Sequence, residues 1–458
     1  MKKRRPDFLV SILLIAASVS LVGQAKRDPR MVALGGAYTT IADGVYAVGV
    51  NPANLAYQHD KPFMWQMGTL NIGIVNSFFS LENWTGLSGA NLERNRQEKK
   101  LEIFNQVRDG LRFTVDTHLA LPALNYSSGN MAFTSDLIVV GDMAFPEDLF
   151  HLILEGNEVD KPFDMALKFE SIGLMEFGFS FAVPYEKFSW GVTLKYLLGG
   201  FYLGIDPDSS YSNLVTDTTA FYGGGRYFIR QGIGGSGFGL DIGFSTGEYN
   251  GWKAGCSLIN ALGTIHWNRG SFIKDMLGVN DSTGLVTWGG EEVPERSAMI
   301  YEFTIDSLNA INMTELDMDS IFVSSKSVVR DTIAGGKPRP FTVRYPAFFR
   351  LGVSRQVDPD LLVVSDLVAG FQDRLYVQRR WKWSFGVQFT RFRSFPLRLG
   401  YSWGGKYLKE LGFGFGLHKG PLIFDFALAF RNGIWIHSMK GITLSMGLSL
   451  TSFRSRKE

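Results

Sequence analysis

The sequence predicts a transmembrane antiparallel β-barrel of about fourteen strands, and three observations support this fold class. Long segments alternate large apolar residues with small or polar ones, the connections between them fall into a short and a long class, and the chain begins with an export signal. Side chains along a strand point alternately to its two faces, so each ladder has one apolar face that suits lipid.

The alternation extends over nearly ten residues in several ladders. The clearest are Phe188–Leu198, Trp381–Thr390 and Ile442–Thr451, and similar ladders run through Phe177–Val183, Phe238–Phe244, Leu397–Trp403, Leu411–Leu417 and Leu422–Phe430. A soluble β-sandwich also alternates. The length of these ladders and the Trp or Tyr near one end of several favour a barrel with aromatic girdles. The ladders number roughly fourteen to sixteen, and fourteen is the even number that we expect.

The connections support the same fold. Short turns are expected at Glu186-Lys187, Asn250-Gly251, Asp358–Asp360 and Lys419-Gly420, and long loops at residues 82–110, 144–162, 205–217 and 267–345. Short turns at one end and long loops at the other are typical of outer-membrane barrels. The Gly-rich stretch Gly232–Gly237 is interpreted as a hairpin turn before a strand, because nothing around it resembles a nucleotide-binding loop.

Some loop segments are expected to be helical. Leu92–Arg108 is charged and amphipathic, and Phe145–Glu155 has Pro and Glu in its first turn with Gly156-Asn157 after its end. Asp306–Ser325 is polar with spaced Leu, Ile and Met, so it is interpreted as a short helix and loop.

The N-terminus has the pattern of a signal peptide. Basic residues Lys2–Arg5 precede an apolar run from Phe8 to Val22, and small residues follow at Gly23 and Ala25. We expect cleavage after Ala25, so residues 1–25 form the signal peptide. The alternative, an uncleaved anchor helix, has a rather short apolar run for about 30 Å of hydrocarbon. No cysteine lies at the cleavage site, which excludes a lipoprotein.

The composition and motifs give little indication of nucleic-acid binding, metal binding or catalysis. The net charge of +2 gives no reason to expect a nucleic-acid partner, and the six histidines are scattered without metal-ligand spacing. The sequence has no catalytic or phosphate-binding motif, so we expect no enzyme, metal or cofactor. A membrane phospholipase built on His418 or His437 is the alternative. The single cysteine, Cys256, and the acidic loop triplets at residues 206–208 and 317–319 are interpreted as structural and solvated.

The polar faces of the ladders indicate a filled lumen. They carry mostly Gly, Ser, Thr and Ala, with scattered charges at Lys195, Asp241, Lys382, Arg398 and Asp425. An open porin needs dense rings of charge on this face. Small residues therefore favour a lumen that is partly occupied by a plug or by inserted loops.

A motif that suits such a plug follows the predicted cleavage site. Its candidate residues are Gly35, Gly36, Ala37, Asn51, Pro52 and Ala53. A Gly pair permits close backbone approach, and Asn-Pro-Ala forms a turn with a fixed φ and a capping side chain. The run from Gly35 to Thr39, the later Ala42-Asp43 and then Asn51-Pro52-Ala53 resemble the N-terminal signature of the FadL/PorV superfamily of outer-membrane barrels.

The resemblance implies fourteen strands and an N-terminal hatch, residues 26–60, ahead of a barrel over residues 61–453. In the transport branch, a hydrophobic ligand binds inside the barrel and movement of the hatch opens a route. The strands do not match that branch residue by residue, so no ligand-contacting residue is carried over. One departure concerns the C-terminus, where a tail, residues 454–458, follows the last aromatic residue, Phe453.

The sequence therefore predicts a plugged channel in the cell outer membrane for hydrophobic small molecules. The alternative is a PorV-like scaffold that docks exported proteins or a secretion machine. Outer-membrane lipids are expected partners in both cases.

Overall fold

The computed structural model describes residues 26–58, 63–87, 97–108, 110–122, 124–156, 158–216, 220–267, 285–288, 291–294, 296–309, 322–329, 340–372, 375, 380–392, 394–405 and 408–452. These residues form a closed antiparallel β-barrel of fourteen strands with a few short helices, which confirms the predicted fold class. The predicted signal peptide, Phe453 and the tail 454–458 lie outside the described residues.

Several of the fourteen strand positions consist of more than one segment, because the chain bends or bulges within them. In order around the barrel the wall is formed by β1 (Phe63–Asn76), β2 with β3 (Leu111–Ala120, Asn125–Ser128), β4 (Met131–Phe145), β6 (Lys168–Pro184), β7 with β8 (Phe188–Ile205, Tyr211–Thr216), β9 (Ala220–Thr246), β10 with β11 and β14 (Trp252–Ile259, Thr264–Trp267, Arg296–Asn309), β15 with β16 and β17 (Phe322–Val329, Phe341–Arg344, Phe348–Asp358), β18 (Leu361–Gly370), β19 (Lys382–Phe389), β20 (Leu397–Gly404), β21 (Lys409–Lys419), β22 (Leu422–Arg431) and β23 (Gly441–Ser452).

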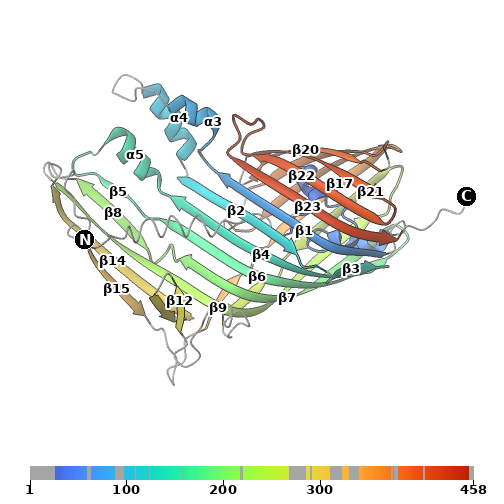
Figure 1. Ribbon diagram of the computed structural model, residues 1–458, viewed down its shortest axis with the longest axis horizontal. Coiled ribbons are helices and arrows are strands. Elements are labelled where there is room, and N and C mark those ends of the chain that lie inside the picture. The colour runs from blue at the N-terminus through green and yellow to red at the C-terminus, as the bar shows by residue number, and fades with distance from the viewer. Residues whose placement is uncertain are drawn as a thin grey trace, which may run out of the picture.

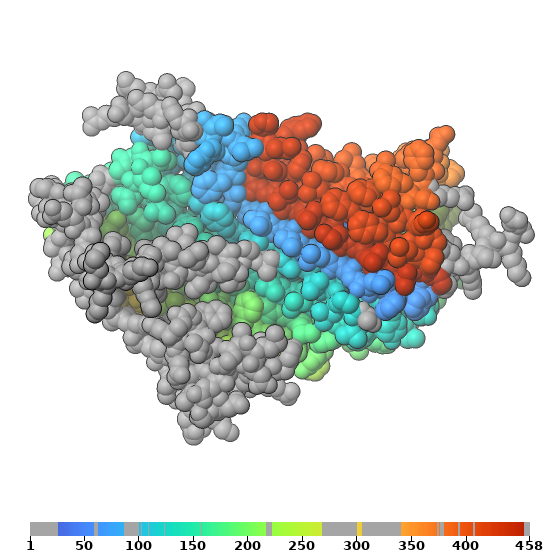
Figure 2. Space-filling model, in the orientation of Figure 1, coloured from blue at the N-terminus to red at the C-terminus, as the bar shows by residue number. Residues whose placement is uncertain are grey.

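The barrel closes where the first strand meets the last. Ile74 of β1 lies opposite Val115 of β2 on one side and opposite Ile442 of β23 on the other. Figure 2 shows the blue first strand directly beside the red last strand. Closure pairs the edges that an open sheet leaves free, which is the condition for strands that cross a membrane.

The two faces of the wall differ as the ladders predicted. On β23, Thr443 and Ser445 are buried inside, whereas Ile442 and Met446 are exposed outside. Other strands repeat this pattern, with exposed Leu194, Phe238, Phe244, Leu351, Phe385, Leu399 and Leu417. Large apolar side chains thus cover the outer surface, the reverse of a water-soluble barrel.

The connections are short at one end of the barrel, and most of those at the other end are longer. The predicted short turns at 186–187, 250–251, 358–360 and 419–420 each join two neighbouring wall strands. The opposite end, called the loop side here, carries α3 (Leu81–Leu87), α4 (Gln97–Val107), α5 (Glu147–Glu155) and β5 (Pro162–Asp164), seen at the upper left of Figure 1. The hairpin of β12 (Leu285–Trp288) and β13 (Glu291–Pro294) is a separate sheet.

Two helices of the loop side, α4 and α5, lie where helices were predicted. α4 lies within the predicted Leu92–Arg108, of which residues 92–96 are not described. α5 begins at Glu147 because Phe145 is the last residue of β4 and Pro146 takes the N-cap position. No helix in the described ranges is long and apolar enough to cross a membrane.

The prediction of a short helix and loop at Asp306–Ser325 is wrong at both ends. Residues 306–309 belong to β14 and residues 322–325 to β15, while the residues between them are not described. The physical reason is β9, which is 27 residues long. Its first half pairs with β8 on one side, and β14 supplies the hydrogen-bond partners that this half needs on the other side.

The turn predicted at Gly232–Gly237 is also wrong, because these residues lie within β9. Their glycines let other residues approach the strand closely. A Cβ at Gly237 would lie 1.7 Å from the carbonyl oxygen of Thr264, and one at Gly235 would lie 2.9 Å from the Ile265 side chain. The Gly-rich composition therefore reflects close packing rather than a change of chain direction.

Candidate functional site: the filled barrel lumen

Residues 26–58, called the N-terminal segment here, lie inside the barrel and are almost entirely buried. The segment forms α2 (Pro29–Ala33) and two 3-10 turns, η1 (Gly44–Ala47) and η2 (Pro52–Tyr57). α2 begins where the Asp28 carboxylate accepts the backbone N–H groups of Arg30 and Met31. Such short elements are marginal in isolation, so the barrel wall has to hold them in place.

Two residues of the predicted motif, Gly35 and Gly36, let the segment turn against the wall. Both adopt positive φ, 63° and 97°, which L-residues with a side chain rarely adopt. A Cβ at Gly400 on β20 would lie 1.9 Å from the Leu34 carbonyl carbon and 2.3 Å from the Gly35 nitrogen. Two backbones meet here without a side chain between them. Ala37 follows and is fully buried.

The second half of the motif, Asn51, Pro52 and Ala53, contacts the opposite side of the wall. The Asn51 side chain accepts the Ala53 N–H at 3.2 Å and donates to the Phe244 carbonyl of β9 at 3.0 Å. A Cβ at Gly243 would lie 2.1 Å from the Asn51 Oδ1. Gly243 is therefore necessary for the turn at Asn51 to lie against β9.

A buried carboxylate fixes the middle of the segment. Asp366 of β18 accepts the backbone N–H groups of Tyr38 and Thr39 at 2.8 and 2.9 Å, together with the Thr39 hydroxyl at 2.6 Å. Arg350 of β17 donates to the same carboxylate oxygen at 2.9 Å and to the Gly36 carbonyl at 2.8 Å. Neither Arg350 nor Asp366 has an exposed side chain, so the pair joins the segment to two strands without help from solvent.

Three basic residues at the beginning of the segment reach different strands. Lys26 pairs with Asp136 of β4 at 2.5 Å and with Glu176 of β6 at 3.1 Å. Arg27 pairs with Glu410 of β21 at 3.0 Å. Arg30 pairs with Asp425 of β22 at 2.7 Å, and with Asp43 of the segment itself. Our sequence reasoning missed these residues, although their cluster directly after the predicted cleavage site was a visible signal.

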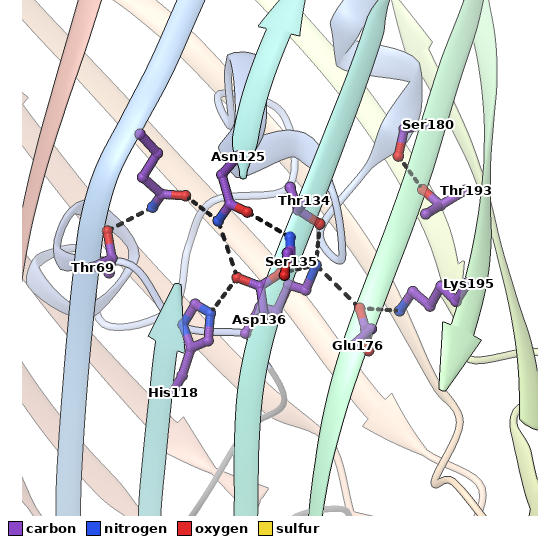
Figure 3. A network of polar contacts seen from close by, with 12 residues as sticks. Thr69, His118, Asn125, Thr134, Ser135, Asp136, Glu176, Ser180, Thr193 and Lys195 are labelled. Carbon is purple, nitrogen blue, oxygen red and sulfur yellow. Dashed lines mark hydrogen bonds and ion pairs between the residues drawn. The ribbon is translucent and has the colours of Figure 1, made fainter. Parts of the chain in front are cut away.

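Lys26 belongs to a polar network that runs along the inner face of the wall from His118 on β2 to Asp241 on β9, most of which is seen in Figure 3. His118 contacts Asp136 at 2.9 Å. Glu176 pairs with Lys195 at 3.3 Å, and Lys195 pairs with Asp241 at 2.9 Å. Burial opposes the charged form of Lys26, but Asp136 and Glu176 outweigh it, so the pKa of its ammonium lies above the ordinary value.

The scattered charges noted in the sequence all take part in buried pairs. Lys195 and Asp241 belong to the network above, Lys382 donates to Glu410 at 2.8 Å, and Arg398 donates to Asp425 at 2.7 Å. Glu176, Glu410 and Asp425 therefore each have both a wall cation and a segment cation as neighbours, whereas Asp366 pairs with a wall cation and accepts backbone N–H groups of the segment. The lumen wall and the N-terminal segment are electrostatically complementary.

The inner wall becomes apolar on the loop side of the network. On β4, Asp136 is followed inside by Ile138 and Val140, and on β6 Glu176 gives way to Leu174 and Ile172. These residues belong to one buried cluster, which also contains Leu197, Ile259, Ile265, Trp267, Val343, Tyr345, Phe348 and Leu375. The lumen thus has two layers, a polar one that holds the segment and an apolar one that faces the loops.

Replacing Lys26 with methionine tests the contribution of the polar layer. The change leaves Asp136 and Glu176 buried with one cation fewer, so we expect a loss of about 3 kcal/mol in the free energy of unfolding. The measurement is the urea midpoint of unfolding in detergent micelles. Lys161→Met, which removes an exposed pair with Glu158, serves as the control and should cost less than about 1 kcal/mol. Equal midpoints for the two variants would contradict the assignment.

The comparisons with known proteins agree with this architecture. A family described as of unknown function (DUF5723) matches residues 56–227. The toluene transporter TbuX of Ralstonia pickettii superimposes with a TM-score of 0.50 at 13% identity, over 94% of this chain and 99% of that chain. The toluene transporter TodX of P. putida gives a TM-score of 0.50 at 12% identity, over 94% and 100% of the two chains. No curated protein matches the sequence.

At such low identity the likeness to TbuX and TodX shows the fold alone. This chain has the architecture of these transporters along nearly its whole length. The match to the family of unknown function covers less than half of the chain and indicates no activity.

Proposed function

We propose that this protein is an outer-membrane β-barrel of the FadL/PorV kind that lets hydrophobic small molecules pass. The N-terminal segment acts as its hatch. Residues 1–25 direct export and are then removed, which leaves Lys26 at the start of the mature chain. The apolar outer surface and the closed, fully paired wall support placement in a lipid bilayer.

The observation that carries the proposal is the apolar layer inside the loop side of the barrel. Barrels that pass hydrophilic solutes keep a polar, water-filled lumen. Here Ile138, Ile172 and Trp267 lie inside the wall and are fully buried. A hydrophobic molecule that arrives from the loop side gains contact with such side chains without leaving polar groups unpaired. The toluene transporters of the same fold give a precedent for small hydrophobic cargo.

The role of the hatch rests on the contacts of the motif residues. Gly35 and Gly36 turn against β20, and Asn51, Pro52 and Ala53 turn against β9. Together with the Arg350–Asp366 pair, these contacts hold the segment at several points around the wall. The segment also contributes buried apolar residues such as Met31, Leu34 and Leu55 to clusters shared with the wall, so its displacement exposes apolar surface as well as exchanging polar bonds for water.

Placement in the membrane is tested by a charge on the outer surface. Leu399→Arg puts a cation on the lipid-facing side of β20, where Leu399 is 56% exposed. We expect this variant to fold into liposomes less stably than wild type by about 2–4 kcal/mol, as arginine does near a bilayer midplane. Leu101→Arg on α4, at a residue that is 58% exposed, is the matched control and should change little. An equal effect at both positions would argue against a lipid-facing belt.

Passage itself is tested with purified barrel in liposomes. A panel of radiolabelled toluene, alkanes and long-chain fatty acids is expected to contain at least one compound that binds or enters faster than into protein-free vesicles. A panel without any binding or uptake would overturn the proposal. The scaffold alternative makes a different prediction, since a scaffold brings exported proteins or parts of a secretion machine when it is isolated from native membranes.

A further inference from the structure

The loop side carries an apolar surface patch that the proposed function does not use. Leu81 and Trp84 of α3 are 52% and 64% exposed, and Trp435 and Ile436 between β22 and β23 are 69% and 55% exposed. These four residues are called the Trp84–Trp435 patch here. Large apolar side chains gathered on a protein surface mark an interaction site.

The patch is built from two connections that are fixed to each other. The Glu82 N–H donates to the His437 carbonyl at 2.9 Å. Asn83 Nδ2 and Lys440 Nζ both donate to the Gln106 side chain of α4, at 2.6 and 2.8 Å. The exposed side chains therefore project from two connections that are hydrogen-bonded to each other rather than from independent loops. Figure 1 shows α3 close to the red connection between β22 and β23.

The patch continues the apolar outer surface of the barrel. α3 follows β1 almost directly, and Ile74 near the end of β1 lies opposite Ile442 near the start of β23, both of them exposed. The 14 residues of β1 extend roughly 43 Å, or about 33 Å along the axis at a tilt of about 40°, whereas the apolar band is about 25 Å tall. The end of β1, and with it the patch, therefore reaches the interface between hydrocarbon and water.

The patch also fills a gap in the ring of tryptophans at this level. Trp383 of β19 and Trp403 of β20 lie opposite each other near the loop-side ends of their strands, and both are exposed. By contrast, β21, β22 and β23 contain neither Trp nor Tyr, and β1 has none from Leu70 to Asn76. Trp84 and Trp435 stand beyond the ends of these strands, at the positions where the strands themselves supply no indole.

We propose that α3 and the β22–β23 connection (residues 432–440) rest in the interfacial region of the outer lipid leaflet and complete the aromatic girdle between β20 and β1. The inference rests on the membrane placement within the proposed function. Indole rings prefer this region because one edge is apolar and the N–H finds a polar partner there. The patch anchors this side of the barrel at a fixed depth in the leaflet.

Spin-label accessibility in liposomes tests the proposal. In a Cys256→Ser background, single variants Trp84→Cys and Trp435→Cys are labelled with a nitroxide, and collisions with oxygen and with a water-soluble nickel complex are measured. Leu399→Cys marks the lipid belt, Trp403→Cys the girdle on β20, and Lys161→Cys an exposed loop. We expect the oxygen-to-nickel ratio at both patch positions to match that at Trp403→Cys and to lie between the other two references.

Three outcomes oppose the proposal and can be told apart. A ratio equal to that at Lys161→Cys places the patch in water. Low collision rates with both reagents show that a protein, such as a second copy of the barrel, covers it. A water-like ratio at Leu399→Cys defeats the membrane placement itself, and with it the proposed function. If Trp84→Cys does not fold, Leu81→Cys on the same helix gives the same reading.

Discussion

Replacing Asp366 with asparagine is expected to destabilise the barrel by about 3–5 kcal/mol, the range for breaking a buried ion pair. The change leaves Arg350 without a charged partner in a place with no exposed surface. It also replaces the carboxylate that accepts the N–H groups of Tyr38 and Thr39 with a weaker, neutral acceptor. The measurement is the unfolding midpoint in urea, read from the heat-modifiable band on gels.

Two comparisons distinguish the effect of the lost charge from the effect on how the N-terminal segment is held. Asp358→Asn, in an exposed short turn, is the control and should leave the midpoint nearly unchanged. The double variant Arg350→Met with Asp366→Leu removes both charges, so it should be less destabilised than Asp366→Asn alone. If Asp366→Asn behaves like Asp358→Asn, the carboxylate does not hold the N-terminal segment.

Adding one methyl group at Gly400 is expected to push the segment off the wall. A Cβ there would lie 1.9 Å from the Leu34 carbonyl carbon, and a backbone atom cannot rotate away as a side-chain tip can. Gly400→Ala should therefore lose at least about 1–3 kcal/mol, the usual range for overpacking. Because the strain falls between segment and wall, we expect the segment to move and ion conductance in planar bilayers to rise above the wild-type value.

Gly68→Ala is the matched control, since nothing lies within 4 Å of a Cβ at Gly68 in β1. A second readout is trypsin, because the only basic residues of the segment are Lys26, Arg27 and Arg30. Cleavage after Arg30 should appear in Gly400→Ala and not in Gly68→Ala. If both variants resist trypsin and conduct like wild type, the contact at Gly400 is not what keeps the segment seated.

Local patterns in the sequence predict much of this fold because their physics is local. The alternation in Ile442–Thr451 fixes which side chains face lipid, and turns such as Lys419-Gly420 fix where the chain reverses. The same local reasoning failed at Gly232–Gly237 and at Asp306–Ser325. Glycines occur both in turns and where backbones approach closely, and a polar segment becomes a strand when a long neighbour such as β9 needs partners.

The partners inside the lumen could not be predicted, because they depend on strands that are far apart in the chain. Arg27 and Glu410 are separated by 383 positions, and Lys26 and Thr134 by 108. Which carboxylate meets which cation follows from the register of neighbouring strands and from where the barrel closes. A shift of a strand by one residue would turn its wall groups, such as Glu410 and Thr134, to the lipid face.

The sequence by itself determined a β-barrel with an apolar exterior, short turns at one end and long loops at the other. It also marked Gly35, Gly36 and Asn51 as special, because their backbone and capping properties are intrinsic. Only the tertiary structure decided how residues 26–58 lie in the lumen, which wall groups hold them, and that an apolar layer lies beyond. These are properties of closure, since the inside of the barrel exists only once β1 has paired with β23.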